Sequence, residues 1–117
     1  NENYFMEYND STEEFLNKAW TETPGILYKA AGISSREIDC FVPHQVNKKR
    51  TEYAAAAANI SLEKTIHIID KIANCASAGV LLALDDARKN HDCAKDKMLM
   101  LIAAGGGISW GGLIIKT

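Results

Sequence analysis

The sequence predicts an α/β fold with a mostly parallel sheet, because short apolar segments typical of strands alternate with longer segments that predict helices. Three apolar segments are typical of strands and span Ile38–Val42, Thr65–Ile69 and Met98–Ala104. Between them, residues 46–58 and 77–89 predict helices, and the first of these contains the strong helix formers Ala54–Ala58. Apolar strands joined by helical connections predict parallel neighbours with right-handed crossovers.

A fourth segment, Leu113–Lys116, completes the predicted sheet. It follows the glycines at 105–107 within a few residues, so it must run antiparallel to the strand before it. The expected fold class is therefore three parallel strands plus an antiparallel edge strand, with crossover helices. Four strands are few for a sheet of this type, and the chain starts without Met. We expect a piece of a longer protein, with one face covered by another domain.

The first part of the chain predicts helix. Ser11 and Glu14 form a capping-box pattern before an apolar stripe. Pro24 is expected to end this helix or to begin a second one. The second helix should stop at Gly32, a residue suited to a left-handed C-terminal cap. We therefore divide the chain into a helical lead-in, residues 1–24, and a domain that carries the sheet, residues 25–117.

Composition and charge exclude several classes of protein. Apolar residues make up 47% and charged residues 24% of the 117 residues, as in globular domains. A net charge of −2 gives no reason to expect nucleic-acid or membrane binding, and the apolar run at 98–104 is too short to span a bilayer. No Cys and His spacing suggests a metal site. The odd number of cysteines favours reduced thiols and a cytoplasmic location; they are Cys40, Cys75 and Cys93.

Three polar or glycine-rich segments follow the three predicted parallel strands, at residues 43–47, 73–77 and 105–107. The carboxyl ends of parallel strands share one edge of a sheet, where ligands bind. His44 and Asn74 would each offer an N–H donor at this edge, and the glycines would offer backbone N–H groups. Such donors suit a developing oxyanion or enolate. The edge has no evident nucleophile.

Ordinary alternatives exist for each of these residues. Asn74 alone fits a helix N-cap, and His44 alone fits a turn residue after a proline. Cys75 together with His44 could form a nucleophilic pair, although a small buried thiol is the commoner state for cysteine. The basic cluster of Lys48, Lys49 and Arg50 could be a solvated helix face or a contact for phosphate or an acidic partner.

Four segments resemble one known family in order and spacing. Residues 41–47 (Phe-Val-Pro-His-Gln-Val-Asn) resemble its V-P-H-Q-A-N motif, and residues 73–78 resemble its G-N-T-S-A-A/S segment. Residues 105–111 resemble its G-G-G-x-[ST]-W-G ending, and residues 83–87 match its second helix. The chain is thus similar, over residues 25–117, to the C-terminal part of the 3-oxoacyl-(acyl-carrier-protein) synthase III family of the thiolase-like superfamily.

The resemblance implies half of a layered αβαβα enzyme, usually a homodimer, that needs no cofactor. Its reaction is decarboxylative Claisen condensation of an acyl thioester with malonyl-ACP in fatty-acid or related polyketide synthesis. The substrates are acyl-CoA and the malonyl group on acyl carrier protein. The nucleophilic cysteine belongs to the N-terminal half, so we expect the isolated chain to be inactive. The alternative is a non-catalytic thiolase-like module that binds an acyl carrier or a partner subunit.

The resemblance also assigns roles to residues. His44 and Asn74 donate to the malonyl thioester oxygen, Gly106 offers a backbone N–H to the oxyanion of the acyl-cysteine step, and Asn47 helps hold the pantetheine arm. The remaining substrate or carrier contacts are Gln45, Lys48, Lys49 and Arg50. Ala73 stands where the family usually has Gly, Cys75 where it has Thr or Ser, and Ala104 where it typically has Phe. These departures leave the acyl preference open.

Overall fold

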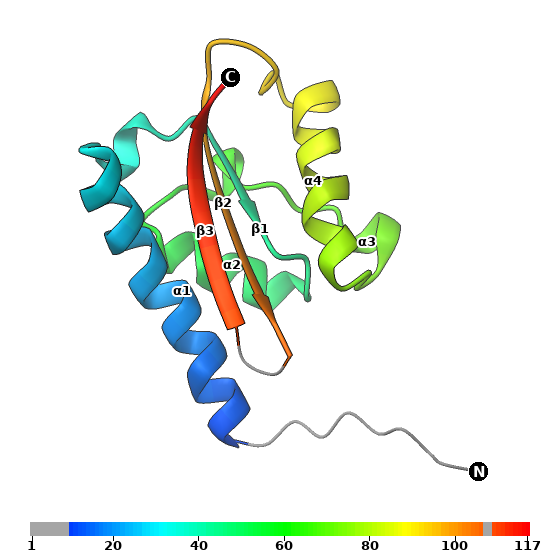
Figure 1. Ribbon diagram of the computed structural model, residues 1–117. Coiled ribbons are helices and arrows are strands. Elements are labelled where there is room, and N and C mark those ends of the chain that lie inside the picture. The colour runs from blue at the N-terminus through cyan, green and yellow to red at the C-terminus, as the bar shows by residue number, and fades with distance from the viewer. Residues whose placement is uncertain (1–9, 107–108) are drawn as a thin grey trace.

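The computed structural model describes residues 10–106 and 109–117. A three-stranded sheet forms its middle layer, with helices on both faces (Figure 1). The strands are β1 (Cys40–Pro43), β2 (Met98–Gly105) and β3 (Ser109–Lys116). The helices are α1 (Asp10–Ala31), α2 (Lys48–Ala57), α3 (Ile69–Ile72) and α4 (Ser77–Asn90).

The strand pairing confirms the expected α/β class. β1 runs parallel to β2, with Cys40 opposite Leu99, and β2 runs antiparallel to β3. The expected strand at 65–69 is reduced to one isolated parallel bridge between Phe41 and Thr65. Pairing stops there because the next N–H from β1 toward this segment would come from residue 43, and Pro43 has no N–H. The described sheet therefore has two parallel strands and one antiparallel strand.

Two apolar cores lie on opposite faces of the sheet, because successive side chains of a strand alternate between faces. Phe41 and Met100 face the core under α1 and α2, where Trp20 is also buried. Val42 and Leu99 face the core under α4. Alanines of α2 and α4 lie against the sheet and let both helices approach closely; they are Ala54, Ala55, Ala83 and Ala87.

Helix α1 continues through Pro24, so the expected break at that residue is wrong. A proline inside a helix costs about 3 kcal/mol because a backbone hydrogen bond is lost. Trp20, Thr23 and Pro24 are all buried on the face of α1 that packs on the sheet, and this packing offsets the cost. The capping box expected from Ser11 lies outside the side chains that the structure describes.

Helix ends follow the predicted caps. Gly32 has a φ of 67°, and the next N–H, of Ile33, donates to Tyr28 O at 3.1 Å, which is a Schellman closure. Asn59 closes α2 with a φ of 54°. Helix α4 begins at the predicted Ser77, and α3 was not predicted.

The cysteines Cys40, Cys75 and Cys93 are free. No helix within residues 10–106 and 109–117 has the length and apolarity to cross a membrane.

Candidate functional site

His44 leaves the carboxyl end of β1 with its backbone still held by the sheet. Its N–H donates to Ile102 O of β2 at 2.8 Å, which extends the parallel ladder by one residue. The imidazole is half-buried, and burial lowers the pKa of His44 because a charged ring is poorly solvated there. Nδ1 is buried without a hydrogen-bond partner among the described residues. At neutral pH the ring is therefore uncharged, with one N–H able to donate.

This shift makes folding stability depend on pH in one direction. Since the folded pKa of His44 lies below its ordinary value of 6.5, the unfolded chain binds the proton more readily. The stability that the neutral ring provides is complete above pH 6.5 and decreases as the pH falls through the lowered folded pKa. We expect the unfolding free energy of the parent protein to fall more between pH 7 and pH 5 than that of His44→Gln. Equal losses in both proteins, or an NMR titration of His44 at or above 6.5, would contradict the lowered pKa.

Asn74 lies in the loop between α3 and α4, with its side chain exposed. We expected it directly after a strand, but α3 intervenes. Its Oδ1 accepts the N–H of Ala76 at 3.0 Å, so the amide oxygen turns toward its own loop. Nδ2 makes no hydrogen bond to a described residue, so the amide keeps a donor available. Asn74 is not the N-cap of α4, because that position is taken by Ala76.

The loop around Asn74 is strained on both sides. Ala73 has a φ of 55° and a ψ of −169°, and Ala76 has a φ of 51° and a ψ of −132°. A residue with a Cβ rarely adopts such backbone angles, and strain of this kind costs on the order of 1–3 kcal/mol per residue. The sequence alone showed only that Ala73 occupies a position where the resembled family usually has Gly.

Replacing Ala73 with glycine should relax this strain. We expect Ala73→Gly to raise the free energy of unfolding by about 1 kcal/mol, because glycine reaches the same angles without a steric penalty. The measurement is chemical denaturation. Ala56→Gly, in an exposed turn of α2, is the matched control and should lower stability by about 0.5–1 kcal/mol. If both substitutions destabilise equally, the loop is not strained at Ala73.

Gly106 lies in the turn between β2 and β3 and is exposed. The last ladder pair before it joins Gly105 to Ser109. Gly107, the third glycine of the predicted segment, lies outside the described residues. A Cβ built on Gly106 would meet no atom of the described residues within 4 Å.

The segments that carry these residues share one edge of the sheet. β1 and β2 are parallel, so His44 and Gly106 follow their carboxyl ends on the same side. The first turn of α4 reaches this edge as well, since a Cβ on Gly79 would lie 3.5 Å from Gln45 Cβ. Figure 1 shows the loop after β1, the α3–α4 loop and the carboxyl end of β2 toward the lower end of the sheet.

Gln45 differs from its expected role in substrate binding. Its side chain is completely buried, and its amide bonds only to backbone groups. Nε2 donates to Pro43 O at 2.8 Å and to Ile66 O at 3.1 Å, while Oε1 accepts the N–H of Ile68 at 2.9 Å. A ligand cannot reach this amide. Gln45 therefore supports the backbone around His44 and does not bind a ligand.

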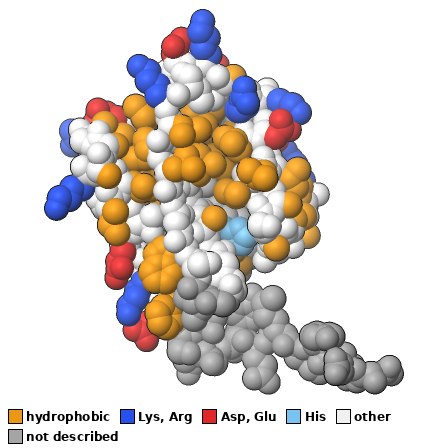
Figure 2. Space-filling model, viewed as in Figure 1, with side chains coloured by type: hydrophobic (Ala, Val, Ile, Leu, Met, Phe, Trp, Pro, Cys, Tyr) orange, Lys and Arg blue, Asp and Glu red, His pale blue; other side chains and the backbone are white. Residues whose placement is uncertain are grey.

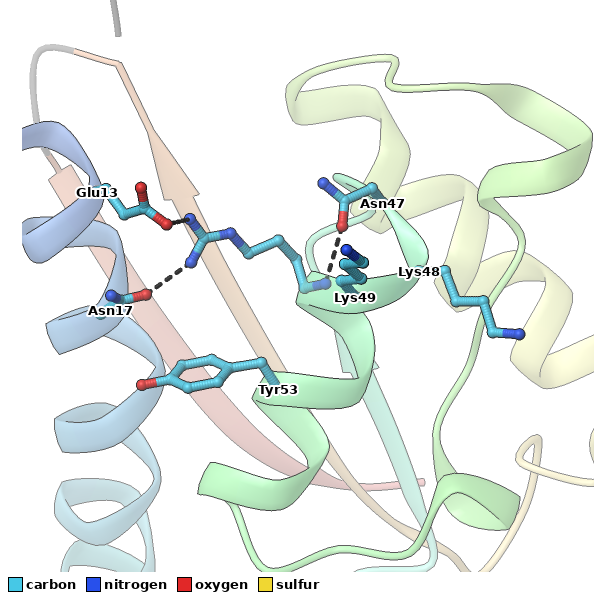
Figure 3. A pocket seen from close by; sticks show the side chains of 7 residues that line it. Glu13, Asn17, Asn47, Lys48, Lys49 and Tyr53 are labelled. Carbon is cyan, nitrogen blue, oxygen red and sulfur yellow. Dashed lines mark hydrogen bonds and ion pairs between the residues drawn. The ribbon is translucent and has the colours of Figure 1, made fainter. Parts of the chain in front are cut away.

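The basic cluster at the start of α2 is divided by the fold. Asn47 caps α2, its Oδ1 accepting the N–H of Arg50 at 2.9 Å. The Arg50 guanidinium reaches α1, where it donates to Asn17 Oδ1 at 2.6 Å and Glu13 Oε1 at 2.8 Å (Figure 3). Arg50 is thus held by α1. Sequence reasoning missed Glu13 and Asn17, although their spacing of four residues places them on one face of a helix.

The lysines of this cluster remain accessible. Lys48 and Lys49 are exposed and make no ion pair with a described residue. They border a groove of about 720 Å³ between α1 and α2 that Figure 3 shows from close by. Its lining residues are Glu13, Asn17, Asn47, Lys48, Lys49, Arg50 and Tyr53. Lys48 also borders a smaller hollow of about 160 Å³ on the other side of α2.

Cys75 is exposed, and its thiol donates to Ile72 O at 2.8 Å. The thiol is thus directed at a backbone carbonyl at the end of α3. No hydrogen bond between Cys75 and His44 is present among the described residues. The structure therefore offers no support for a Cys–His pair within this chain.

Comparison with protein families shows to which family the chain belongs. The model of the family described as 3-oxoacyl-[acyl-carrier-protein (ACP)] synthase III C terminal matches residues 28–117. The chain belongs to this family. A beta-ketoacyl-[acyl-carrier-protein] synthase III of Bartonella henselae is 39% identical over 96 residues, 82% of this chain and 30% of that protein. A relative of the same description from Staphylococcus epidermidis is 37% identical over 90 residues, 77% of this chain and 29% of that protein.

Solved structures of the family agree with the fold. The 3-oxoacyl-[acyl-carrier-protein] synthase III of Aquifex aeolicus VF5 superimposes with a TM-score of 0.85 and 26% identity, over 94% of this chain and 36% of that one. Another 3-oxoacyl-(acyl-carrier-protein) synthase III has a TM-score of 0.79 and 30% identity, over 90% of this chain and 32% of that one. The chain thus spans about a third of the length of the relatives it matches.

Proposed function

We propose that this chain forms the C-terminal part of a cytoplasmic condensing enzyme that joins an acyl thioester to malonyl-ACP in fatty-acid or related polyketide synthesis. The observation that carries the proposal is the family match over residues 28–117, which includes His44, Asn74 and Gly106. The nucleophilic cysteine lies in the remainder of the enzyme, and the substrates are acyl-CoA and the malonyl carrier. The proposed steps use no cofactor besides these two substrates.

The reaction proceeds in two stages. First, the cysteine thiolate attacks the acyl-CoA thioester, so that an acyl-cysteine forms and the CoA thiolate leaves. Second, the bond between the malonyl α-carbon and its carboxylate breaks, CO₂ departs, and the electron pair moves into the thioester as an enolate. The enolate carbon attacks the acyl-cysteine carbonyl, and the tetrahedral intermediate collapses to the 3-oxoacyl carrier. The expelled thiolate is again the nucleophile.

The residues of this chain would stabilise the charges that develop. His44 and Asn74 donate N–H groups to the enolate oxygen, and the Gly106 backbone N–H donates to the oxyanion on the acyl-cysteine. A neutral imidazole suits this role because it donates without needing a charge in a half-buried position. The inward bond of the Asn74 oxygen supports an outward-facing amide donor.

An exposed apolar surface supports the need for the remaining part of the enzyme. Figure 2 shows apolar side chains gathered on one face of the molecule, the face on which Figure 1 places β3 and α4. The exposed large apolar side chains of these two elements are Leu81, Leu82, Trp110, Leu113 and Ile115. Apolar patches on this scale commonly mark an interface. We propose that the N-terminal half covers this face and that the complete enzyme is a homodimer.

The test of the proposed function is condensation by the complete enzyme and by this chain alone. We expect the complete enzyme to release CO₂ from malonyl-ACP and to form a 3-oxoacyl product from acyl-CoA. The isolated chain should form none, because it lacks the acyl-accepting cysteine. Turnover by the isolated chain would contradict a shared site. Binding of the carrier by the complete enzyme without any decarboxylation would favour a non-catalytic carrier-binding module.

Lys48 and Lys49 are the carrier contacts that the groove supports, with Asn47 beside them for the pantetheine arm. Acyl carrier proteins are acidic, and a rim charge contributes mainly to association rate and its salt dependence. We expect the double substitution Lys48→Glu and Lys49→Glu to raise the Kd for the carrier at least about tenfold at low salt, measured by titration calorimetry. The difference should shrink at high salt.

Charge reversal elsewhere provides the control for this experiment. Lys29 is exposed near the end of α1, outside the groove. Lys29→Glu changes the net charge by −2, as each of the two groove substitutions does. It should leave the affinity for the carrier near the parent value. Equal weakening by the control would indicate a general charge effect rather than docking at α2.

A further inference from the structure

Pro43 interrupts the pairing between β1 and the segment that follows α2. Phe41 O accepts the N–H of Ile66 at 2.8 Å, which belongs to the bridge between Phe41 and Thr65. In a parallel pair, the next bond toward this segment would be donated by the residue two places along β1. That residue is Pro43, which has no N–H. Ile66 O is consequently left without its ladder donor.

The side chain of Gln45 takes the place of this missing rung. One amide donates to Ile66 O at 3.1 Å and to Pro43 O at 2.8 Å, and its oxygen accepts the N–H of Ile68 at 2.9 Å. Both amide hydrogens and the oxygen are engaged, and the residue is completely buried. The amide therefore bonds three backbone groups of β1 and the 66–68 segment, one of which, Ile66 O, has no ladder donor because residue 43 is proline.

The same side chain contacts the helix that follows the Asn74 loop. A Cβ on Gly79, in the first turn of α4, would lie 3.5 Å from Gln45 Cβ and 4.0 Å from Gln45 Cγ. His44 is the preceding residue in the chain. The Gln45 side chain thus joins the loop that carries His44 to the segment that leads through α3 to Asn74 by its amide, and its aliphatic part lies beside the start of α4.

We propose that Gln45 is a positioning residue that sets the placement of His44 relative to Asn74 during malonyl decarboxylation. This inference rests on the proposed function. Removing the amide leaves buried backbone groups without partners, and the cost of this loss favours a shift of the 66–68 segment away from β1. Because that segment leads to Asn74, the two donors then lose their common alignment. Displacement by about 1 Å in an active site can lower a rate about a hundredfold.

The experiment is Gln45→Met in the complete enzyme, a change that keeps side-chain length but removes all three bonds. Two rates are measured: decarboxylation of malonyl-ACP and transfer of the acyl group from acyl-CoA to the enzyme. We expect decarboxylation to fall about a hundredfold. Acyl transfer should stay near the parent rate, because Gly106 follows β2, whereas the hydrogen bonds of Gln45 to described residues reach only Pro43 and the 66–68 segment. Ile60→Val, a truncation in the opposite core, controls for lost stability and should leave the ratio of the two rates unchanged.

A double-mutant cycle tests whether Gln45 acts through His44. In the His44→Ala enzyme, Gln45→Met should lower decarboxylation little further, since the donor it aligns is already gone. Gln45→Asn keeps a neutral amide on a side chain one carbon shorter, so it should fall between the parent and Gln45→Met, and it serves if the Met variant does not fold. An unchanged ratio of rates, or fully additive losses in the cycle, would overturn the positioning role while leaving the proposed function intact. Undiminished decarboxylation by His44→Ala would instead remove the assigned role of His44, and absence of CO₂ release and condensation by the complete enzyme would remove the proposed function itself.

Discussion

His44→Ala in the complete enzyme is expected to slow malonyl decarboxylation about a hundredfold to a thousandfold, the usual cost of one lost donor to a developing oxyanion. The substitution removes an N–H that meets little negative charge on the ground-state thioester but full charge on the enolate. Acyl transfer to the cysteine should change much less, because that oxyanion is assigned to the Gly106 backbone. Release of CO₂ under single-turnover conditions gives the first rate, and labelling of the enzyme by radioactive acyl-CoA gives the second.

Asn74→Ala should produce the same pattern of rates, since both side chains donate to one oxygen. Asn74→Asp is the sharper companion variant, because it keeps the size and the bond to Ala76 N–H but replaces the outward donor with an acceptor. We expect it to be at least as slow as Asn74→Ala. Loss of acyl loading with intact decarboxylation would reverse the assigned roles, and a normal rate for Asn74→Asp would exclude the amide as a donor.

Gly112→Ala is expected to destabilise the fold by about 1–3 kcal/mol, the range for overpacking a close contact. A Cβ at this position would lie 2.7 Å from Leu101 O, 2.9 Å from Leu27 Cδ1 and 3.0 Å from Thr23 Cγ2. The carbonyl belongs to the β2 backbone and cannot move without disturbing the ladder. The other two atoms belong to α1, so the helix must also separate from the sheet. Thermal or chemical unfolding measures the loss.

The neighbouring glycine provides the matched control. A Cβ on Gly111 would meet nothing within 4 Å, so Gly111→Ala adds the same methyl group to the same strand without a clash. We expect its unfolding free energy to stay within about 0.5 kcal/mol of the parent value. If the two variants were equally stable, α1 would not lie as close to β3 as the structure places it.

The fold and the site differ in how far local patterns could predict them. The order of strands and helices, the start of α4 at Ser77 and the caps at Gly32 and Asn59 follow from short-range signals. The position of His44 after a buried strand follows in the same way. Pro24 was misjudged because proline is a local signal for a break, whereas burial against the sheet depends on residues far along the chain.

The amino-acid sequence by itself determined the alternation of strands and helices, the family motifs and the placement of His44 and Gly106 beyond parallel strands, because periodicity, caps and connectivity act over a few residues. Only the tertiary structure decided that Gln45 is buried rather than open to substrate, and that the Arg50 side chain donates hydrogen bonds to Glu13 and Asn17. It also decided that Thr65 makes a single bridge instead of a strand. Each of these outcomes depends on contacts between groups far apart in the sequence, and such groups become neighbours only when the chain is folded.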